Sequence, residues 1–526
     1  MSPLAQVAHL LASAVKFAQI TQTVFISTGI ALATALAWYC LSWATSPLRR
    51  YPGPALAGWT NLWRLAVVRT GDYHLRMRQL HDKYGPVVRV GPNTLSLDYP
   101  DLIKTVYGTD GKWPKTEFYH SSSAIVNGKI QYTLFGESDP DAHARMKRPV
   151  AKYFATGAVL ALEPHIDRAI VEFCKQLDRR FVSAPDGPQT FDLLEWAMYL
   201  AWDFSSAAIF SRRFGYIDKG CDFDGSIAMS QKVGSYFQQV AQLPALDFLL
   251  DKNPVVRIGP PTFTNLARVS VEGFVARLQG KDTDFDPKTP DFLQHFIDAK
   301  AEFPDVDDGT IIGYVMVSVI AGGDTTALVA TAVLYFALRH PAVLERLVNE
   351  VREAGVNPDA PVPYNVARRL SYLEAAIRET TRLHPVVGMQ LERYVPEGGL
   401  ALPDGSIVPP GTGVGINPYI IGRNSDLWGQ DVDDFRPERW LRADGEDEVA
   451  FATRWRRQAA SDLNFGAGER MCLGKNLGLV EVYKIVATLL NRYDMALADP
   501  GREWVVDGGW MLRPRGLSVT FFPRKA

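Results

Sequence analysis

The chain has 526 residues, of which 47% are hydrophobic, so it is long enough to bury a large core. Its 56 basic and 58 acidic residues give a net charge of −2. This balance argues against nucleic acid as a partner, because nucleic-acid binding needs a strongly basic surface. The scattered cysteines, Cys40, Cys174, Cys221 and Cys472, predict no disulfide framework and favour a reducing compartment.

An uncharged apolar stretch near the N-terminus predicts a membrane anchor. No charged residue lies between Lys16 and Arg49, and residues 24–43 supply the roughly 20 apolar residues that a membrane-spanning helix needs. Arg49 and Arg50 follow, and a positive flank predicts a cytoplasmic C-terminal side. A cleaved signal peptide is the alternative, but its apolar core would be shorter. We therefore expect a transmembrane signal-anchor helix at 24–43, behind a segment 1–23 whose position the sequence leaves open.

Prolines dominate the segment that follows this anchor. Pro47, Pro52 and Pro54 fix φ and remove backbone donors, so residues 44–58 are predicted to form a stiff, extended hinge. No linker rich in Pro, Ser or Gly divides the chain after this hinge. Residues 59–526 are therefore expected to form one large unit.

A long apolar helix is predicted over Gly309–His340, with Asp307 or Asp308 as its N-cap. At 1.5 Å per residue, about thirty residues span roughly 45 Å, which is enough to cross a whole domain. The stretch is apolar nearly all round, and such a helix is buried.

Polar and small residues interrupt this helix at Gly322, Gly323, Asp324 and Thr325. Adjacent glycines remove side-chain bulk, and a threonine hydroxyl can bond back to a carbonyl four residues earlier and bend the helix. We expect an opened groove with an acid and an alcohol beside it, a pair that can deliver protons to a reacting group. The alternative is a kinked helix whose polar groups are merely satisfied.

A second helix and a strand-rich segment follow. Glu379 and Arg382 lie three residues apart within Tyr372–Pro385, so they share one helix face. An exposed pair of this kind contributes little to stability. Short strands are predicted around the turn residues Gly398-Gly399, Asp404-Gly405 and Pro410-Gly411. The sequence therefore predicts a mainly α fold with a small β region.

The run Phe465–Gly474 presents one cysteine, Cys472, between glycines and two residues after Arg470. Glycines let a backbone turn tightly and approach a flat cofactor. A single thiolate presented in this way can ligate a haem iron, onto which it pushes electron density. A zinc site is excluded because zinc takes three or four protein ligands. A buried structural cysteine is the alternative that spacing alone leaves open.

The full pattern of Phe465, Gly468, Arg470, Cys472 and Gly474 matches the haem-binding signature of the cytochrome P450 monooxygenases. The chain resembles this family from about Tyr51 to the C-terminus. The resemblance implies the cytochrome P450 fold behind the transmembrane helix, and a haem b whose iron is ligated by the Cys472 thiolate.

The resemblance also implies roles for residues outside this loop. Arg393 and Arg470 would bind the haem propionates, and a guanidinium suits a carboxylate. Asp324 and Thr325 match the acid–alcohol pair that manages protons during O2 activation. Haem-thiolate isomerases and dehydratases usually lack this pair, so its presence argues for a monooxygenase.

Two further sets of residues are assigned by the resemblance. Where many relatives carry a Trp and an Arg four residues apart, this chain has His143 and Lys147, which would bind a propionate in their place. Arg148 is a rival, and a solvated basic helix face is the alternative. A buried triad behind the haem is implied for Glu379, Arg382 and Arg439.

The segments that vary in this fold and set specificity are mostly apolar here, which predicts a small lipophilic substrate. They are Phe118–Phe135, Val317–Ala321, Val386–Gln390 and Asp507–Met511, with the apolar side chains Ile125, Val126, Val317, Ile320, Val386, Val387, Met389 and Trp510. We expect hydroxylation, epoxidation or oxidative demethylation with O2. The alternatives are an isomerase or dehydratase that needs no O2, and a haem-binding protein without turnover.

Electrons are expected to come from NADPH through NADPH–cytochrome P450 reductase. Arg454, Arg456 and Arg457 precede the cysteine loop and could steer an acidic donor, although a solvated helix end is the alternative. The expected location is the endoplasmic reticulum membrane, with a single span and a cytoplasmic body. The phrases at Tyr84–Ser96, Val395–Leu400 and Phe435–Leu441 resemble the pisatin-demethylase-like fungal enzymes of secondary metabolism.

Overall fold

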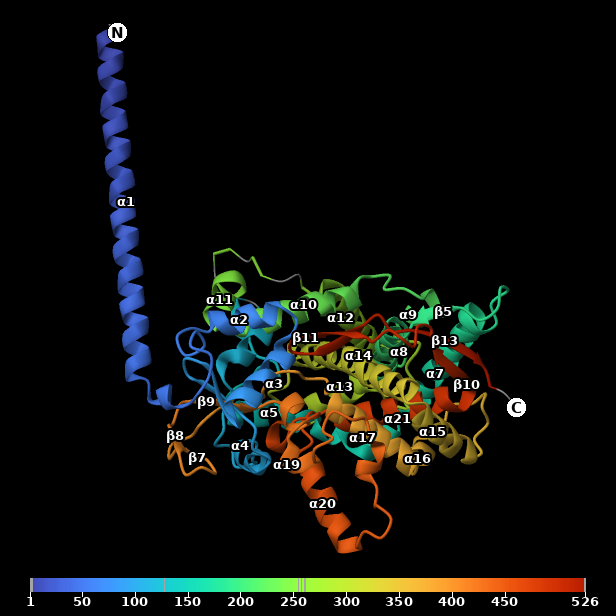
Figure 1. Ribbon diagram of the computed structural model, residues 1–526. Coiled ribbons are helices and arrows are strands. Elements are labelled where there is room, and N and C mark those ends of the chain that lie inside the picture. Colours follow the sequence, from blue (N-terminus) through green and yellow to red (C-terminus); the bar gives the residue numbers. More distant parts are fainter. Residues whose placement is uncertain (1–2, 127, 254, 257, 260–261, 525–526) are drawn as a thin grey trace.

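The computed structural model describes residues 3–126, 128–253, 255–256, 258–259 and 262–524. Among these residues, the helices of eight or more residues are α1 (Pro3–Thr45), α2 (Leu62–Arg69), α3 (Tyr73–Tyr84), α5 (Pro140–Ala151), α7 (Glu163–Leu177), α8 (Leu193–Phe210), α10 (Ser226–Val240), α12 (Thr264–Leu278), α13 (Phe292–Glu302), α14 (Asp308–Arg339), α15 (Pro341–Glu353), α17 (Ser371–Leu383), α20 (Glu448–Ala460) and α21 (Lys475–Arg492). Shorter helices are α4 (Ile103–Val106), α6 (Thr156–Leu160), α9 (Tyr216–Lys219), α11 (Pro244–Asp247), α16 (Tyr364–Ala367), α18 (Pro418–Ile421) and α19 (Ser425–Trp428). Helices dominate the body (Figure 1).

The strands form small sheets at the margins of this helical body. They are β1 (Val87–Gly91), β2 (Thr94–Leu97), β3 (Ala124–Val126), β4 (Lys129–Gln131), β5 (Thr190–Asp192), β6 (Arg393–Tyr394), β7 (Leu400–Ala401), β8 (Ile407–Val408), β9 (Gly413–Ile416), β10 (Tyr493–Leu497), β11 (Val505–Gly508), β12 (Leu512–Arg515) and β13 (Ser518–Pro523). The largest sheet has the order β1-β2-β9-β6, with β2 and β9 parallel and the other pairs antiparallel. The prediction of a mainly α fold with a small β region is confirmed.

The N-terminal helix α1 projects away from the body (Figure 1). Its 43 residues reach about 65 Å at 1.5 Å per residue, well beyond the ~30 Å hydrocarbon core of a bilayer. The part that is long and apolar enough to span a membrane is Gln19–Thr45, which includes the predicted span 24–43 and is not buried by the body. A second helix, Asp308–Arg339, passes the same test, but it is mostly buried and belongs to the core.

The segment after α1 is not the extended connector that its prolines predicted. Pro47–Arg50 forms a short 3-10 helix, η1, which the Ser46 hydroxyl caps by accepting a hydrogen bond from the Leu48 amide (3.2 Å). Leu48 is only 1% exposed. Arg89 of β1 donates to the Ser46 hydroxyl (3.0 Å) and to the Gly58 carbonyl (3.2 Å). Proline suits the first turn of a helix, and these contacts with the body stabilise a folded hinge.

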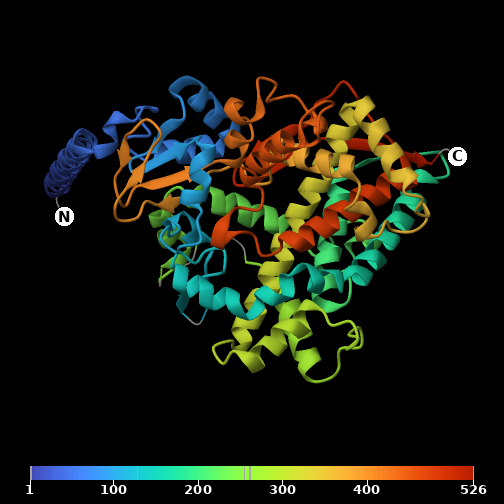
Figure 2. The same cartoon turned by 90° about the horizontal axis from the view of Figure 1, so that it is seen from below.

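Helix α14 forms the spine of the core. It runs from Asp308 to Arg339, and Asp307 caps it by accepting from the Thr310 amide (2.7 Å). The predicted helix and its cap are thereby confirmed, within one residue at each end. Seen from below, its yellow ribbon passes through the middle of the body, with α21 in orange-red beside it (Figure 2). Because α14 packs against α8, α17 and α21, its central residues have fixed neighbours.

Candidate active site

Cys472 lies between the short 3-10 helix η8 (Gly468–Arg470) and α21. Its amide donates to the Phe465 carbonyl (2.8 Å), which folds the loop back on itself. The Cys472 side chain is accessible. Desolvation raises the pKa of its thiol, whereas the Gly474 amide and the Lys475 ammonium group lower it. An accessible sulfur on a fixed loop is suited to ligate a metal ion, and a bound cation would favour the thiolate.

Gly468 lets this loop pass close to the end of α4. Its φ is +62°, and a Cβ atom at this position would lie 1.9 Å from the Tyr107 carbonyl oxygen and 2.6 Å from that of Gly108. Any side chain would therefore collide with backbone. Gly474 lies at the N-cap of α21, and the Lys475 ammonium group lies 5.8 Å from the centre of the Phe465 ring.

Two predicted arginines lie buried near the loop and are held by backbone carbonyls. Arg393, in β6, donates to the Glu392 carbonyl (2.8 Å). Arg470 donates to the carbonyls of Glu137 (2.7 Å) and Ser138 (3.1 Å). The Arg470 Nε atom is buried and has no hydrogen-bond partner within the described part of the chain. Both guanidinium groups are thus oriented, with donor capacity left over.

His143 and Lys115 extend this basic cluster. Desolvation, followed by the charges of Arg470, Lys115, Lys147 and Arg393, lowers the pKa of His143 to about 3. Desolvation, Arg393 and Arg470 likewise lower the pKa of Lys115. Among the described residues, no carboxylate lies within salt-bridge distance of Arg393, Lys115 or His143. Arg393 therefore carries a buried positive charge without a carboxylate partner among the described residues, whereas Arg470 lies 3.8 Å from Glu469 and the low pKa of His143 leaves its ring neutral.

This uncompensated charge fits a haem. Unpaired charge is costly to bury, and two carboxylates placed here would remove most of that cost. Haem b carries two propionate carboxylates, and arginine binds a carboxylate with two parallel hydrogen bonds. The donor set and the nearby cysteine loop therefore suit a haem.

Lys115 was missed by the sequence analysis. It forms an isolated β-bridge with Arg393, and its ammonium group donates to the Phe135 carbonyl (2.6 Å). The available signal was a lysine inside an aromatic run, between Trp113 and Phe118, where a charged side chain needs a specific partner.

The structure separates the remaining basic candidates on α5. His143 borders the cluster, whereas the Lys147 ammonium group donates to the Glu469 carbonyl (2.9 Å) and so holds the cysteine loop itself. Arg148 is exposed, which places it on the solvated face of α5.

Side chains of α8 fill the space that Gly322 and Gly323 leave free on α14, where the sequence predicted an open groove. A Cβ atom at Gly322 would lie 2.6 Å from the Ser205 hydroxyl, and one at Gly323 would lie 2.7 Å from the Trp202 ring. Both partners belong to α8. The absence of side chains therefore lets α8 and α14 approach closely, and α14 remains an uninterrupted helix.

Asp324 and Thr325 point to different partners. The Asp324 carboxylate accepts hydrogen bonds from Trp202 (3.1 Å), Ser230 (3.0 Å) and Arg513 (2.9 Å). The Thr325 hydroxyl donates to the Ala321 carbonyl (2.8 Å), as the sequence predicted, and stays accessible. The acid and the alcohol are neighbours on the helix, but they are not hydrogen-bonded to each other.

Thr326, the next residue, connects α14 to α21. Its hydroxyl donates to a carboxyl oxygen of Glu481 (2.8 Å). The other Glu481 oxygen is buried without a partner in the described residues, and desolvation raises the pKa of this carboxyl to about 8. A neutral carboxyl group is therefore present in the core on the cysteine side of α14.

Three of the four segments predicted to set specificity, 118–135, 386–390 and 507–511, contribute to one hydrophobic cluster with an aromatic centre. Phe118, Tyr119, Phe135, Phe237 and Trp510 pack mostly edge to face; the ring centres of Phe118 and Phe237 are 5.4 Å apart, and those of Phe237 and Trp510 are 5.5 Å apart. Phe237 belongs to α10, which the sequence analysis did not include.

The apolar side chains predicted for the substrate pocket lie inside the protein wherever they are described. Val386, Met389 and Trp510 are buried, and Ile125, Val317, Ile320 and Val387 are half-buried. The side chain of Val126 lies outside the described set. The strand segment 386–388 is bonded to the 510–512 turn, because the Gly388 amide donates to the Trp510 carbonyl (2.9 Å).

The structure brings Glu379, Arg382 and Arg439 together in the core. Glu379 accepts from Arg382 (2.7 and 2.9 Å) and from Arg439 (3.1 Å). The Trp440 indole (3.0 Å) and the Arg436 amide (3.1 Å) complete its shell. This geometry locks α17 to the segment that precedes the cysteine loop.

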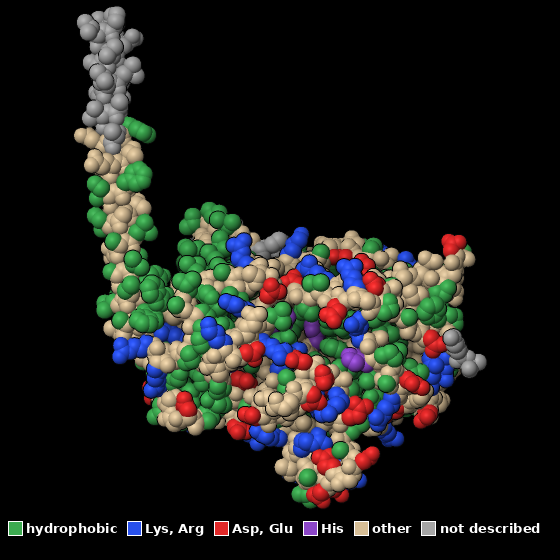
Figure 3. Space-filling model, in the orientation of Figure 1, with side chains coloured by type: hydrophobic (Ala, Val, Ile, Leu, Met, Phe, Trp, Pro, Cys, Tyr) green, Lys and Arg blue, Asp and Glu red, His purple; other side chains and the backbone are tan. Residues whose placement is uncertain are grey.

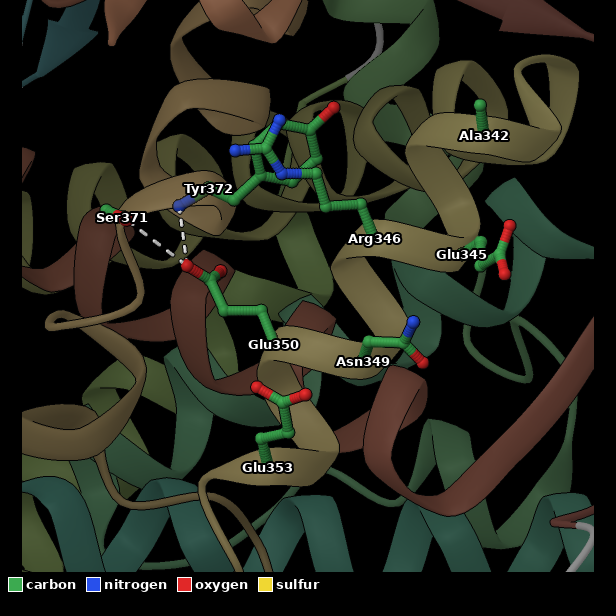
Figure 4. A pocket seen from close by; sticks show the side chains of 8 residues that line it. All are labelled: Ala342, Glu345, Arg346, Asn349, Glu350, Glu353, Ser371 and Tyr372. Atoms are coloured by element: carbon green, nitrogen blue, oxygen red, sulfur yellow. Dashed lines mark hydrogen bonds between the residues drawn. The ribbon is translucent and has the colours of Figure 1, made fainter. Parts of the chain in front are cut away.

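A surface pocket between α15 and α17 is distinct from this site (Figure 4). Glu350 projects into it, but the carboxylate is already used: it accepts from the Tyr372 amide (2.8 Å), the Leu373 amide (2.9 Å) and the Ser371 hydroxyl (3.3 Å). Glu350 therefore caps the start of α17, which is a structural role.

Comparison with known proteins agrees with this geometry. A family model described as Cytochrome P450 matches residues 52–521. Cytochrome P450 monooxygenase cfoH of Aspergillus candidus is 44% identical over 500 residues, which cover 95% of this chain and 93% of that protein. A cytochrome P450 monooxygenase of Aspergillus terreus is 34% identical over 457 residues (85% and 90%). Cytochrome P450 monooxygenase cicH of Emericella nidulans is 33% identical over 475 residues (89% and 92%). The chain therefore belongs to the cytochrome P450 family and is a haem-thiolate monooxygenase.

Proposed function

We propose that this monooxygenase inserts one atom of O2 into a small lipophilic molecule of fungal secondary metabolism. The observation that carries the site assignment is the accessible Cys472 thiol on a loop near the buried guanidinium groups of Arg393 and Arg470. The fungal relatives, which are named as monooxygenases, favour this reaction over isomerisation or dehydration. The apolar segments and the three resembling phrases, of pisatin-demethylase-like type, support the substrate class.

The bound haem supplies the chemistry of O2 activation, and the chain supplies its environment. Cys472 would ligate the iron, and Phe465, Gly468 and Gly474 would shape the loop around it. Arg393 and Arg470 would bind the propionates as cations, and His143 and the newly recognised Lys115, whose pKa values are lowered, would lie beside them as hydrogen-bonding groups. Lys147 would contribute by holding the loop at Glu469.

Thr325 and Asp324 would manage protons. The Thr325 hydroxyl is accessible, and because its one proton is donated to the Ala321 carbonyl, its oxygen can accept from and so orient a water that would deliver the proton. Asp324 is anchored on the other side of the helix and would resupply protons through water. We assign Glu379, Arg382 and Arg439 to folding and haem retention.

Electrons would come from NADPH through its cytochrome P450 reductase. Of the three arginines predicted to dock this partner, Arg454 is paired with Glu446 (2.7 Å) and donates to the Leu441 carbonyl (2.9 Å). Arg456 and Arg457 are exposed, so we propose that only these two of the three arginines attract the reductase.

The proposed location is the endoplasmic reticulum membrane, with a cytoplasmic body. Arg49 and Arg50 at the end of α1 support this orientation. Apolar side chains also gather over α11 on the side of the body toward which α1 projects (Figure 3). Exposed apolar residues of this region are Phe248, Leu249, Val255, Val256 and Ile258. A membrane surface would cover such a patch.

The first test is the carbon monoxide difference spectrum of the reduced protein, beside Cys472→Ala. We expect a strongly red-shifted Soret band in the wild type that the variant loses. Its absence from folded, haem-loaded wild type would overturn the assignment of Cys472.

The second test identifies the reaction. Lipophilic compounds that shift the haem spin state are incubated with ¹⁸O2, NADPH and reductase. We expect products that carry one ¹⁸O atom. Product formation without O2 or NADPH would instead establish an isomerase or dehydratase.

A further inference from the structure

Asp324 is held by side chains from three separate elements. Trp202 of α8 donates to one carboxylate oxygen (3.1 Å), while Ser230 of α10 (3.0 Å) and Arg513 of β12 (2.9 Å) donate to the other. Asp324 is 1% exposed and the Arg513 side chain is 14% exposed. The sequence analysis assigned no role to these three donors.

Two of these elements also form the aromatic cluster. Phe237 lies on α10, and Trp510 lies in the turn that leads into β12. The Trp510 amide donates to the side-chain oxygen of Gln238 on α10 (2.9 Å). Helix α10 and the β11–β12 turn therefore contact each other twice: at the aromatic cluster with the Gln238–Trp510 hydrogen bond, and through the Asp324 carboxylate that both elements bind.

Arg513 is the one cation paired with this carboxylate in the described structure. Removing one partner of a buried ion pair is costly, and a guanidinium that donates to a carboxylate fixes the orientation of that carboxylate. The second terminal nitrogen of Arg513, Nη1, is buried and has no partner in the described residues, so it can bind a further oxygen without releasing Asp324.

We propose that Arg513 is a positioning residue for proton delivery: it fixes the orientation of the Asp324 carboxyl group, and it ties α10 and the β11–β12 turn to the acid of α14. The inference rests on the proposed role of Asp324. Ser230 and Trp202 share in the orientation, but they are neutral donors and do not replace the charge.

The test compares Arg513→Met with Arg515→Met. Arg515 lies on the same strand, but its side chain is 65% exposed and it pairs with Asp507 outside this network. The readout is the H2O2 released per O2 consumed when the holoenzyme turns over with NADPH and reductase in the absence of substrate. Reduction of O2 to H2O2 takes two electrons and two protons, whereas reduction to water takes four of each, so impaired proton delivery would raise the share of peroxide and no substrate has to be known.

We expect Arg513→Met to raise the ratio of peroxide to water about tenfold, the effect of losing one charge-assisted hydrogen bond. Arg513→Lys should recover much of this loss, because it keeps the charge. Arg515→Met should match the wild type. An unchanged ratio in Arg513→Met, or no recovery in Arg513→Lys, would overturn the proposal.

Hydrogen exchange provides a readout that does not depend on turnover. Amides of α10 and of β12 should exchange faster in Arg513→Met than in Arg515→Met, because the tie to α14 is lost. Equal exchange rates in the two variants would contradict the proposal that Arg513 holds these elements to α14.

Asp324→Asn separates this inference from the proposed function. If Asp324→Asn releases more peroxide and Arg513→Met does not, the acid has its proposed role and the positioning inference fails. If Asp324→Asn itself matches the wild type, the proposed role of Asp324 is wrong.

Discussion

Two buried carboxylates, Glu379 and Asp324, are each paired with arginine, but they differ in how many donors they accept from and in where those donors lie along the chain. Glu379 is saturated by two arginines, an indole and a backbone amide, all from α17 itself and the segment 436–440. Asp324 has three donors, one each from α8, α10 and β12. A fully saturated charge fixes one arrangement, whereas a charge shared among separate elements changes when any of them moves.

Glu481 is a third buried carboxyl group and sharpens this contrast. It has a hydrogen bond from Thr326 and no basic partner among its described neighbours. Desolvation therefore dominates, and the pKa is raised to about 8. The three groups thus range from a carboxyl group paired with two arginines, through one paired with a single arginine, to one without a basic partner among the described residues.

The largest effect is expected for Glu379→Ala. Removing this carboxylate leaves Arg382 and Arg439 buried without their anion, which should lower the free energy of unfolding by about 3–5 kcal/mol and reduce haem retention. Denaturant unfolding and haem content measure this. Glu272→Ala is the control, since its pair with Arg268 is exposed and should change stability by less than about 1 kcal/mol. If both variants lost the same free energy of unfolding, the expected difference between a buried and an exposed ion pair would be wrong.

The next effect concerns Glu481→Gln and depends on pH. The carboxyl has an ordinary pKa of 4.5 and a folded-state pKa of about 8, so the folded protein binds the extra proton between these values. Its contribution to stability is complete below pH 4.5 and is lost as the pH rises toward 8. Glutamine stays neutral, so the variant should gain on the wild type by up to ~1.4 kcal/mol per pH unit in this window. Urea unfolding at several pH values measures the gain, and parallel stability profiles would show that Glu481 is ionised in the fold.

Thr325→Ala tests whether the Thr325 hydroxyl takes part in proton delivery. The variant should fold and bind haem normally, because the Thr325 hydroxyl bonds only to the Ala321 carbonyl of its own helix. Proton delivery should suffer, so that NADPH is still consumed while H2O2 accumulates and coupled product falls about tenfold. Peroxide and NADPH assays measure this. Coupling at the wild-type level would mean that another group relays the proton.

The smallest effect is expected at the surface. Arg456→Glu with Arg457→Glu should raise the apparent KM for reductase about threefold at low salt, with kcat unchanged, because exposed charges act on encounter and are screened. Lys281→Glu with Lys288→Glu is a control of equal charge on an exposed loop. Identical KM values for the two double variants would remove Arg456 and Arg457 from the docking surface.

The features that could be predicted from sequence are those encoded locally. The cysteine loop is a contiguous pattern, and the cap, length and polar interruption of α14 follow from residue order. The Thr325 back-bond also spans only four residues. Glu379 and Arg382 share a helix face, but the convergence of Arg439 came from the resemblance rather than from spacing.

Residues brought together from distant parts of the chain could not be predicted in this way. Lys115 joins Arg393 and Arg470 across the fold, and Arg513 reaches Asp324 from the C-terminal hairpin. The same holds for Gly322 and Gly323. The sequence shows that they have no side chains, but only the fold shows that Ser205 and Trp202 of α8 occupy the space they leave.

By itself, the sequence determined the membrane-length apolar helix, the thiolate loop, the apolar spine with its acid and alcohol, and the mainly helical class, because periodicity and short motifs are local properties of a chain. Tertiary structure alone decided which charged or acidic groups have partners: Glu379 has two arginines and Asp324 has one, whereas Glu481 has no basic partner and Arg393 has no carboxylate partner among the described residues. The physical reason is that the cost of a buried charge depends on neighbours that only folding brings within hydrogen-bonding distance.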